Sequence, residues 1–180
     1  TKKVADRLDE IFRNERAQLE EKWDNLKLFI EFGMLSDDKF CDRAMKFCLL
    51  KNTENKYFSI EDYKKAIEGG QTDKDKKVVF LYATDTDAQY SFIEAAKNKG
   101  YDVLLMDCHL DSHFVNLLEA KLENVRFARV DSDSIDNLIP TEDKIRPELS
   151  ESDQEDLTTM FKAVLPAGNE YNVHADNLGA

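Results

Sequence analysis

The sequence predicts an α/β protein. A helical coil layer comes first, followed by a small three-layer α/β unit with a short, mainly parallel sheet, and then by a truncated helix–strand piece. Two apolar runs, Val78–Ala83 and Val103–Met106, have the length and the β-branched and aromatic content of strands buried on both faces. Apolar residues at spacings of three and four lie between them, which indicates a helix. Strands joined by a helix pair in parallel through right-handed crossovers.

Residues 1–70 are predicted to form the helical layer. Apolar residues recur with helical spacing along its first half, and their phase changes between Asn14 and Gln18, so we expect a break there. Gly33 should end this segment, and Ser36 should begin the next helix. The two apolar stripes, which should face the core, are Val4, Leu8, Ile11 and Phe12, then Leu19, Trp23, Leu26, Phe29 and Ile30.

The end of this layer carries signals for a short helix. Ser59, with Asp62 three residues later, resembles a capping box, and Gly69-Gly70 should end the helix that follows. Cys41 and Cys48 are seven residues apart, so we expect them to share one helix face as small core residues.

Residues 71–139 are predicted to form the small α/β subdomain. Thr84–Asp87 follows the first strand and offers oxygens to cap a helix, and Gly100 should take the left-handed conformation at the end of that helix. Val125–Val130 alternates apolar and basic residues, as an edge strand does. The residues expected to pin the end of the subdomain onto it are Ile135, Leu138 and Ile139.

The second helix of the subdomain should be capped by Asp111 or Ser112. Phe114 lies in its first turn, and the sequence leaves open whether this ring is in the core or exposed. An exposed aromatic ring at a helix start suits the binding of an apolar segment of another protein. The expected apolar face consists of Phe114, Leu117, Leu118 and Leu122.

Residues 140–151 are predicted to be an acidic linker, and residues 152–180 the beginning of a further domain. Ser152 with Glu155 forms a second capping box before an apolar helix, and Tyr171–Ala175 alternates like a strand. This piece is too short to build a core of its own. Because an unpaired strand pairs readily with another edge, we expect residues from 150 onward to dock on a neighbouring molecule or to be mobile.

Composition limits the classes of partner. Three cysteines without a CxxC pair indicate reduced thiols and a cytoplasmic setting. The net charge of −12 disfavours nucleic-acid binding, and no apolar run approaches the roughly 20 residues of a membrane span. Thr1 stands where an initiator Met would, so we expect a piece of a longer protein.

The motifs for common catalytic and cofactor chemistry are missing from the sequence. No glycine-rich phosphate loop occurs, and the turn after the first strand carries two carboxylates that would repel an anion. His109 and His113 are four apart, but His109 precedes the expected helix, so the two need not share a metal. Cys108 and His109 are adjacent on an extended chain and point to opposite sides. We therefore expect no catalytic, cofactor-binding or metal-binding residue, which favours a binding or mechanical module.

One alternative stays open, a small doubly wound α/β ligand-binding or enzyme domain. Its ligand would lie at the carboxyl ends of the strands, near Ala83–Asp85 and Asp107–His109.

The order of segments resembles the distal middle domain of the heat shock protein 90 chaperone family, bacterial HtpG type. KKVADRLDEIF and KWDNLKLFIEFGMLSD resemble its helical coil, and FSIEDYKKAIEGGQ resembles a short helix and the turn after it. KKVVFLYATD and AAKNKGYDVLLMDCHLDSHFVNLL are similar to its strand and strand–helix segments. SDQEDLTTMFKAVL and YNVHADNLGA resemble the start of its C-terminal dimerisation domain.

The resemblance implies a fragment of an ATP-dependent molecular chaperone that assists protein folding. ATP and Mg would be bound by the full-length protein upstream of Thr1, and the helices that make the homodimer would lie after Ala180. The fragment itself would therefore be no enzyme. It would couple the ATPase part to the dimerisation part and contact partly folded client proteins. The client-binding positions that the resemblance implies are Ser112, His113 and Asn116, with Phe114 supplying an aromatic surface beside His113.

Overall fold

The computed structural model describes residues 2–140 and the helix α8 (Glu151–Val164). The chain divides into two compact units, Thr1–Thr141 and Glu142–Ala180. The helix expected after the acidic linker is confirmed by α8. The linker itself and the strand expected at Tyr171–Ala175 lie outside the described residues, as does the docking or mobility expected of the C-terminal end.

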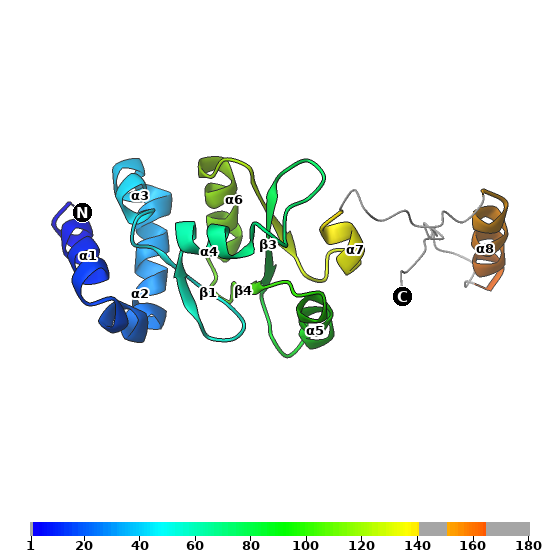
Figure 1. Ribbon diagram of the computed structural model, residues 1–180, viewed down its shortest axis with the longest axis horizontal. Helices are drawn as coiled ribbons and strands as arrows, with labels where there is room; N and C mark the ends of the chain where they lie inside the picture. Colours follow the sequence, from blue (N-terminus) through cyan, green and yellow to red (C-terminus); the bar gives the residue numbers. More distant parts are fainter. Residues whose placement is uncertain (1, 141–150, 165–180) are drawn as a thin grey trace. The chain divides into compact units, whose positions relative to one another are not determined.

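The first unit is built around a three-stranded parallel sheet with the strand order β4-β3-β5 (Figure 1). β3 (Val78–Ala83) is the central strand and is apolar throughout, because both of its faces are covered. β4 (Val103–Leu105) and β5 (Val125–Arg129) flank it. The predicted parallel sheet is therefore confirmed, with β5 at an edge.

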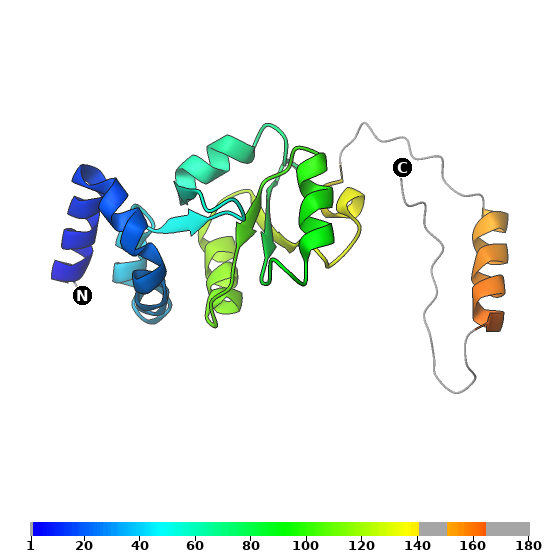
Figure 2. The same cartoon turned by 90° about the horizontal axis from the view of Figure 1, so that it is seen from below.

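Helices cover both faces of this sheet and complete the predicted three-layer unit. α5 (Tyr90–Asn98) and the short α7 (Ile135–Leu138) lie over one face, and α4 (Ile60–Ile67) and α6 (Asp111–Lys121) over the other (Figures 1 and 2). Alternate residues of β3 divide between the two cores. The core under α5 and α7 contains Val79, Leu81, Ala83, Ile93, Ala96, Leu138 and Ile139.

The helical layer extends the other core. α1 (Lys2–Asn14), α2 (Arg16–Ser36) and α3 (Asp38–Ala44) follow one another, and the break between α1 and α2 confirms the phase change read from the sequence. One continuous set of buried side chains runs from this layer to the sheet. Its largest members are Trp23, Tyr63, Phe47, Phe80 and Phe114.

Two predicted helix boundaries are wrong. Gly33 does not end α2, which continues to Ser36. A Cβ atom at Gly33 would lie 2.8 Å from the Phe40 ring, so glycine permits close packing of α3 against α2 here. Ser36 does not begin α3, because the cap is Asp37, whose Oδ1 accepts hydrogen bonds from the backbone N–H groups of Lys39 and Phe40.

A short antiparallel hairpin of β1 (Leu49–Lys51) and β2 (Tyr57–Ser59) was not predicted. It is joined to the β4 side of the sheet through Asn52, whose Nδ2 donates to Asp102 Oδ2 at 2.8 Å. Cys48 is buried just before this hairpin and lies beyond the end of α3, so Cys41 and Cys48 are both core residues but do not share a helix face.

The caps of the sheet helices also differ in part from the prediction. Ser59 caps α4 as expected, accepting from Asp62 N at 3.1 Å, and Gly100 is left-handed with φ 78°. Thr84–Asp87, however, does not cap α5, whose N-cap is Gln89 without a side-chain bond. The Asp85 carboxylate instead closes its own turn by accepting from the N–H groups of the two residues before Gln89.

Candidate functional site

The start of α6 carries the positions implied as client contacts. Ser112 and His113 in its first turn, and Asn116 one turn on, are exposed. Phe114 N donates to Leu110 O at 2.9 Å, which is the α-helical hydrogen bond that closes the first turn. The three polar side chains form one open surface on this helix.

Phe114 is not part of that surface. Its side chain is only 1% exposed and belongs to the core that α6 shares with the sheet and the helical layer. The sequence left both environments open, and burial decides against the exposed anchor, because the ring has no free face for a partner. Phe114 therefore cannot supply the aromatic surface expected beside His113.

Asp111 fixes the start of α6 without capping it. The N-cap position is Leu110, which makes no side-chain bond, so neither Asp111 nor Ser112 is the cap expected from the sequence. The buried Asp111 carboxylate turns back to the preceding loop, where its Oδ2 accepts from Cys108 N at 2.7 Å. A carboxylate in the first turn also suits the positive end of the helix.

α2 supplies the charges that face Asp111. Lys27 Nζ lies 3.1 Å from Asp111 Oδ2, 3.3 Å from Asp107 Oδ1 and 3.9 Å from Glu31 Oε1. These carboxylates raise the pKa of Lys27, although its burial acts in the opposite direction. Lys27 therefore stays charged and ties α2 to the first turn of α6.

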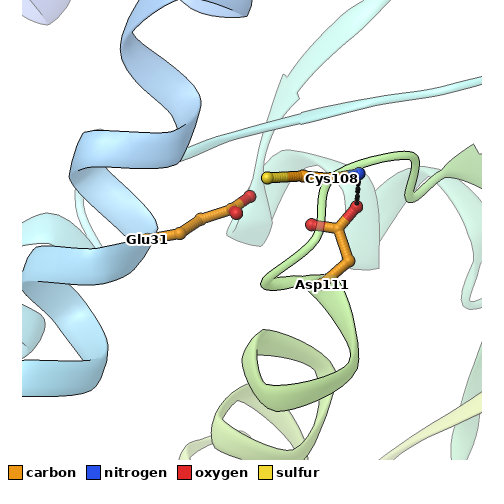
Figure 3. A group of neighbouring side chains, drawn as sticks. All are labelled: Glu31, Cys108 and Asp111. Carbon is orange, nitrogen blue, oxygen red and sulfur yellow. Dashed lines mark hydrogen bonds between the residues drawn. The ribbon is translucent and has the colours of Figure 1, made fainter.

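Glu31 is the unusual member of this group, because a carboxyl group on α2 is 1% exposed in an apolar core. Burial, and then the neighbouring Asp111 carboxylate, raise the pKa of Glu31 to about 8. Figure 3 shows the Glu31 carboxyl group and the Cys108 thiol pointing toward each other, with Asp111 beside them. A small cavity of about 10 Å³, lined by Trp23, Glu31 and Phe114 among others, lies at the same junction.

α2, the helix that carries Lys27 and Glu31, also exposes large apolar side chains. Leu28, Phe29 and Phe32 are 45%, 73% and 63% exposed. Phe29 was expected in the core, and that expectation is wrong. Leu28 and Phe32 each follow one of the residues that face α6, Lys27 and Glu31, so they lie one step further around the same helix.

The sequence contained a usable signal for this surface. Trp23 and Ile30 are buried, as their spacing predicts, and Phe32 falls outside that stripe. An aromatic residue out of phase with a helix's buried face points to solvent or to a partner.

The strand ends do not form the phosphate site of a doubly wound domain. At the end of β3, the N–H groups of Thr84 and Asp85 both donate to Gln89 Oε1, at 2.7 and 3.1 Å. The amide donors that could hold an anion there are therefore already satisfied by the chain's own side chain.

Among the described residues no helix is long and apolar enough to cross a membrane. His109 and His113 are both exposed. Among the residues that the structure describes, neither belongs to a group of three potential metal ligands.

Comparisons with known proteins agree with the resemblance noted in the sequence. The family model described as Hsp90 protein matches residues 1–174. The chain is 53% identical over 181 residues to the chaperone protein HtpG of Bacteroides fragilis strain YCH46, and 50% identical over 182 residues to that of Porphyromonas gingivalis strain ATCC 33277. These alignments cover 99% and 100% of this chain and 27% of each relative.

A solved middle domain of a Plasmodium falciparum heat shock protein superposes with a TM-score of 0.43 at 16% identity, over 58% of this chain and 44% of that one. The chain spans about a quarter of the length of the curated relatives that it matches. Because the family model covers nearly all 180 residues at once, the chain belongs to the Hsp90 protein family.

Proposed function

We propose that this chain is the part of an ATP-dependent molecular chaperone that contacts partly folded client proteins. The observation that carries the proposal is the exposure of polar residues in the first two turns of α6 and of large apolar side chains on α2, two helices that Lys27 joins. Soluble proteins rarely leave such side chains together in water without a partner. The client surface consists of Ser112, His113 and Asn116 on α6 with Leu28 and Phe32 on α2. Phe29 lies about 200° around α2 from Lys27 and faces away from α6.

Client contacts at this surface should be weak and tolerant of sequence. The apolar side chains of Leu28 and Phe32 are 45% and 63% exposed on one helix, so a partner would contact them only in part and gain little after the costs of association. Extended apolar segments of an unfolded protein suit such a surface, because they make many similar short contacts and need no pocket of defined shape.

The full-length protein would bind ATP and Mg outside this piece and would act as a homodimer. The turn after β3 does not favour a nucleotide phosphate, because its amide donors are taken by Gln89 and it carries Asp85 and Asp87. The chain's own part is mechanical. The ion pairs of Lys27 join the helical layer to α6, so a displacement of one moves the other, which would couple the ATPase part to the dimerisation part.

An amide NMR titration of the isotopically labelled chain with an unfolded model protein tests the client surface. We expect shifts at residues 112, 113 and 116 and around Phe32, and no shifts from ATP in a parallel titration. Phe32→Ser should weaken client binding about five- to tenfold, as the loss of an exposed aromatic contact does.

Phe92→Ser is the matched control, because Phe92 is also an exposed aromatic residue, 42% exposed, but lies on α5 over the opposite face of the sheet. Equal weakening by both variants would mean that the client binds exposed aromatic rings without preference and would contradict this site. ATP-induced shifts around Ala83–Asp87 would favour the ligand-binding alternative.

A further inference from the structure

Three potential ligand groups from distant parts of the chain meet at the junction of α2 and α6. The carboxylate oxygens of Glu31 and Asp111 and the thiol sulfur of Cys108 lie within 4.8 Å of one another (Figure 3). Glu31 comes from the middle of α2, Cys108 from the loop after β4, and Asp111 from the first turn of α6. All three elements are held by the core, so the approach of the groups follows from the fold.

Two buried oxygens of this group have no hydrogen-bond partner. They are Glu31 Oε2 and Asp111 Oδ1, on residues that are 1% and 3% exposed. Buried carboxylate oxygens are normally hydrogen-bonded, because an unpaired one loses its hydration without replacement. Lys27 and the Cys108 N–H act on Asp111 through its other oxygen, Oδ2, and Lys27 is nearest to Oε1 of Glu31. Lys27 therefore faces one oxygen of each carboxylate, and the other oxygen of each, Glu31 Oε2 and Asp111 Oδ1, is unpaired.

We propose that Glu31, Cys108 and Asp111 form a binding site for a thiophilic divalent cation of the zinc type. One sulfur and two carboxylate oxygens suit Zn²⁺, whereas Mg²⁺ and Ca²⁺ take oxygen ligands alone. Three protein ligands leave a fourth tetrahedral position for water.

The charges of the group favour a divalent ion. The two carboxylates and a thiolate carry three negative charges, Lys27 carries one positive charge, and a divalent cation makes the buried group neutral. A divalent cation at this position therefore leaves no uncompensated charge in the buried group.

Lys27 would support the site from outside. By holding Asp111 Oδ2 at 3.1 Å it orients the carboxylate, so that Oδ1 remains free for the cation. A bound ion would tie α2 to α6 directly. If the proposed function is correct, it would stiffen the support beneath the client surface, but metal binding itself does not depend on that function.

Titration of the chelator-treated chain with Co²⁺ tests the site. Binding should produce a thiolate-to-cobalt charge-transfer absorption and raise the melting temperature. Cys108→Ser should abolish the absorption, and Glu31→Gln should weaken binding at least about tenfold. Asp107→Asn is the matched control, because Asp107 also contacts Lys27 but lies outside the ligand group. The Asp107→Asn chain should bind Co²⁺ as tightly as the parent does.

A second measurement works without a colour change. Cys41 and Cys48 are fully buried, so in the native chain a thiol reagent should modify Cys108 first. Zn²⁺ should slow this modification in the parent and in Asp107→Asn, and much less in Glu31→Gln, with circular dichroism confirming that each variant is folded. Charge-transfer absorption that survives in Cys108→Ser, or modification that Zn²⁺ does not slow in the parent, would overturn the proposal. The two unpaired oxygens would then be explained by a proton shared between Glu31 and Asp111.

Discussion

At the residue scale, Phe114 contributes to folding stability and not to the surface that contacts a client. Its ring is 1% exposed and packs in the core beneath the client surface. Phe114→Ala should lower the free energy of unfolding by about 3–5 kcal/mol, since truncation of a buried aromatic ring removes transfer energy and leaves a cavity. Urea denaturation of the parent and the variant measures this.

Ser112→Ala, the neighbouring exposed position, should change the free energy of unfolding by no more than about 0.5 kcal/mol. A Phe114→Ala variant that keeps its full stability but no longer binds a client would contradict the burial of this ring.

The residues of the candidate site could be predicted only in part, and the reason lies in the distance along the chain. Helical spacing placed Trp23 correctly in the core, because that signal is contained within one helix. Glu31 stands at a buried position of the same helix, and the groups that account for it, Cys108 and Asp111, come almost 80 residues later. No local sequence pattern predicts a contact between residues so far apart in the chain. Phe114 was undecided for a similar reason, since the first turn of a helix can face either way until its neighbours are known.

At the scale of elements, the N-terminus of α4 gives a prediction about pH. Ser59, followed by the guanidinium of Arg16, lowers the pKa of Asp62 from its ordinary value of 3.8. A lowered folded-state pKa contributes stability that is fully present above 3.8 and is lost as the pH falls through the folded-state value. Asp62→Asn should therefore cost less than about 1 kcal/mol at neutral pH, because the pair with Arg16 is largely exposed.

Chemical denaturation of Asp62→Asn and the parent across the acid range tests this. The two stability curves should converge as the pH falls through and below 3.8. A difference that stays constant over the whole range would mean that packing, and not charge, is responsible.

The elements that the sequence identified best are those with the strongest local pattern. β3 was placed correctly because six consecutive apolar residues admit little else, and Gly100 because a left-handed residue is needed after α5. The β1–β2 hairpin was missed because each strand has three residues, too few for an alternation to register. Gly33 was misread as a helix end, since the Phe40 ring that requires a glycine there belongs to the next helix.

At the scale of the whole molecule, the helical layer and the sheet share one core. Side chains of β3 and β5 such as Phe80 and Phe127 lie in the same buried cluster as Trp23 of α2. The Tyr63 ring of α4 lies 5.0 Å from that of Phe80, centroid to centroid, and covers the sheet face from the first 70 residues. A boundary near residue 70 therefore divides the chain by sequence pattern, while the packing runs across it.

This shared core predicts how pieces of the chain will fold. Residues 71–141 alone would lose α4 and the helical layer and keep only α6 on the face of the sheet that carries Val78, Phe80 and Phe127. A short three-stranded sheet with one face only partly covered buries too little apolar surface to be stable. We expect this piece to lack a cooperative thermal transition and to give poorly dispersed amide signals. Residues 1–141 should melt cooperatively, because they form one compact unit with both cores complete. Amide NMR spectra and thermal melts of the two pieces decide the matter. Well-dispersed signals from residues 71–141 would mean that the face toward α2 contributes little to folding, and the coupling between the helical layer and α6 would then have to rest on the ion pairs of Lys27 alone.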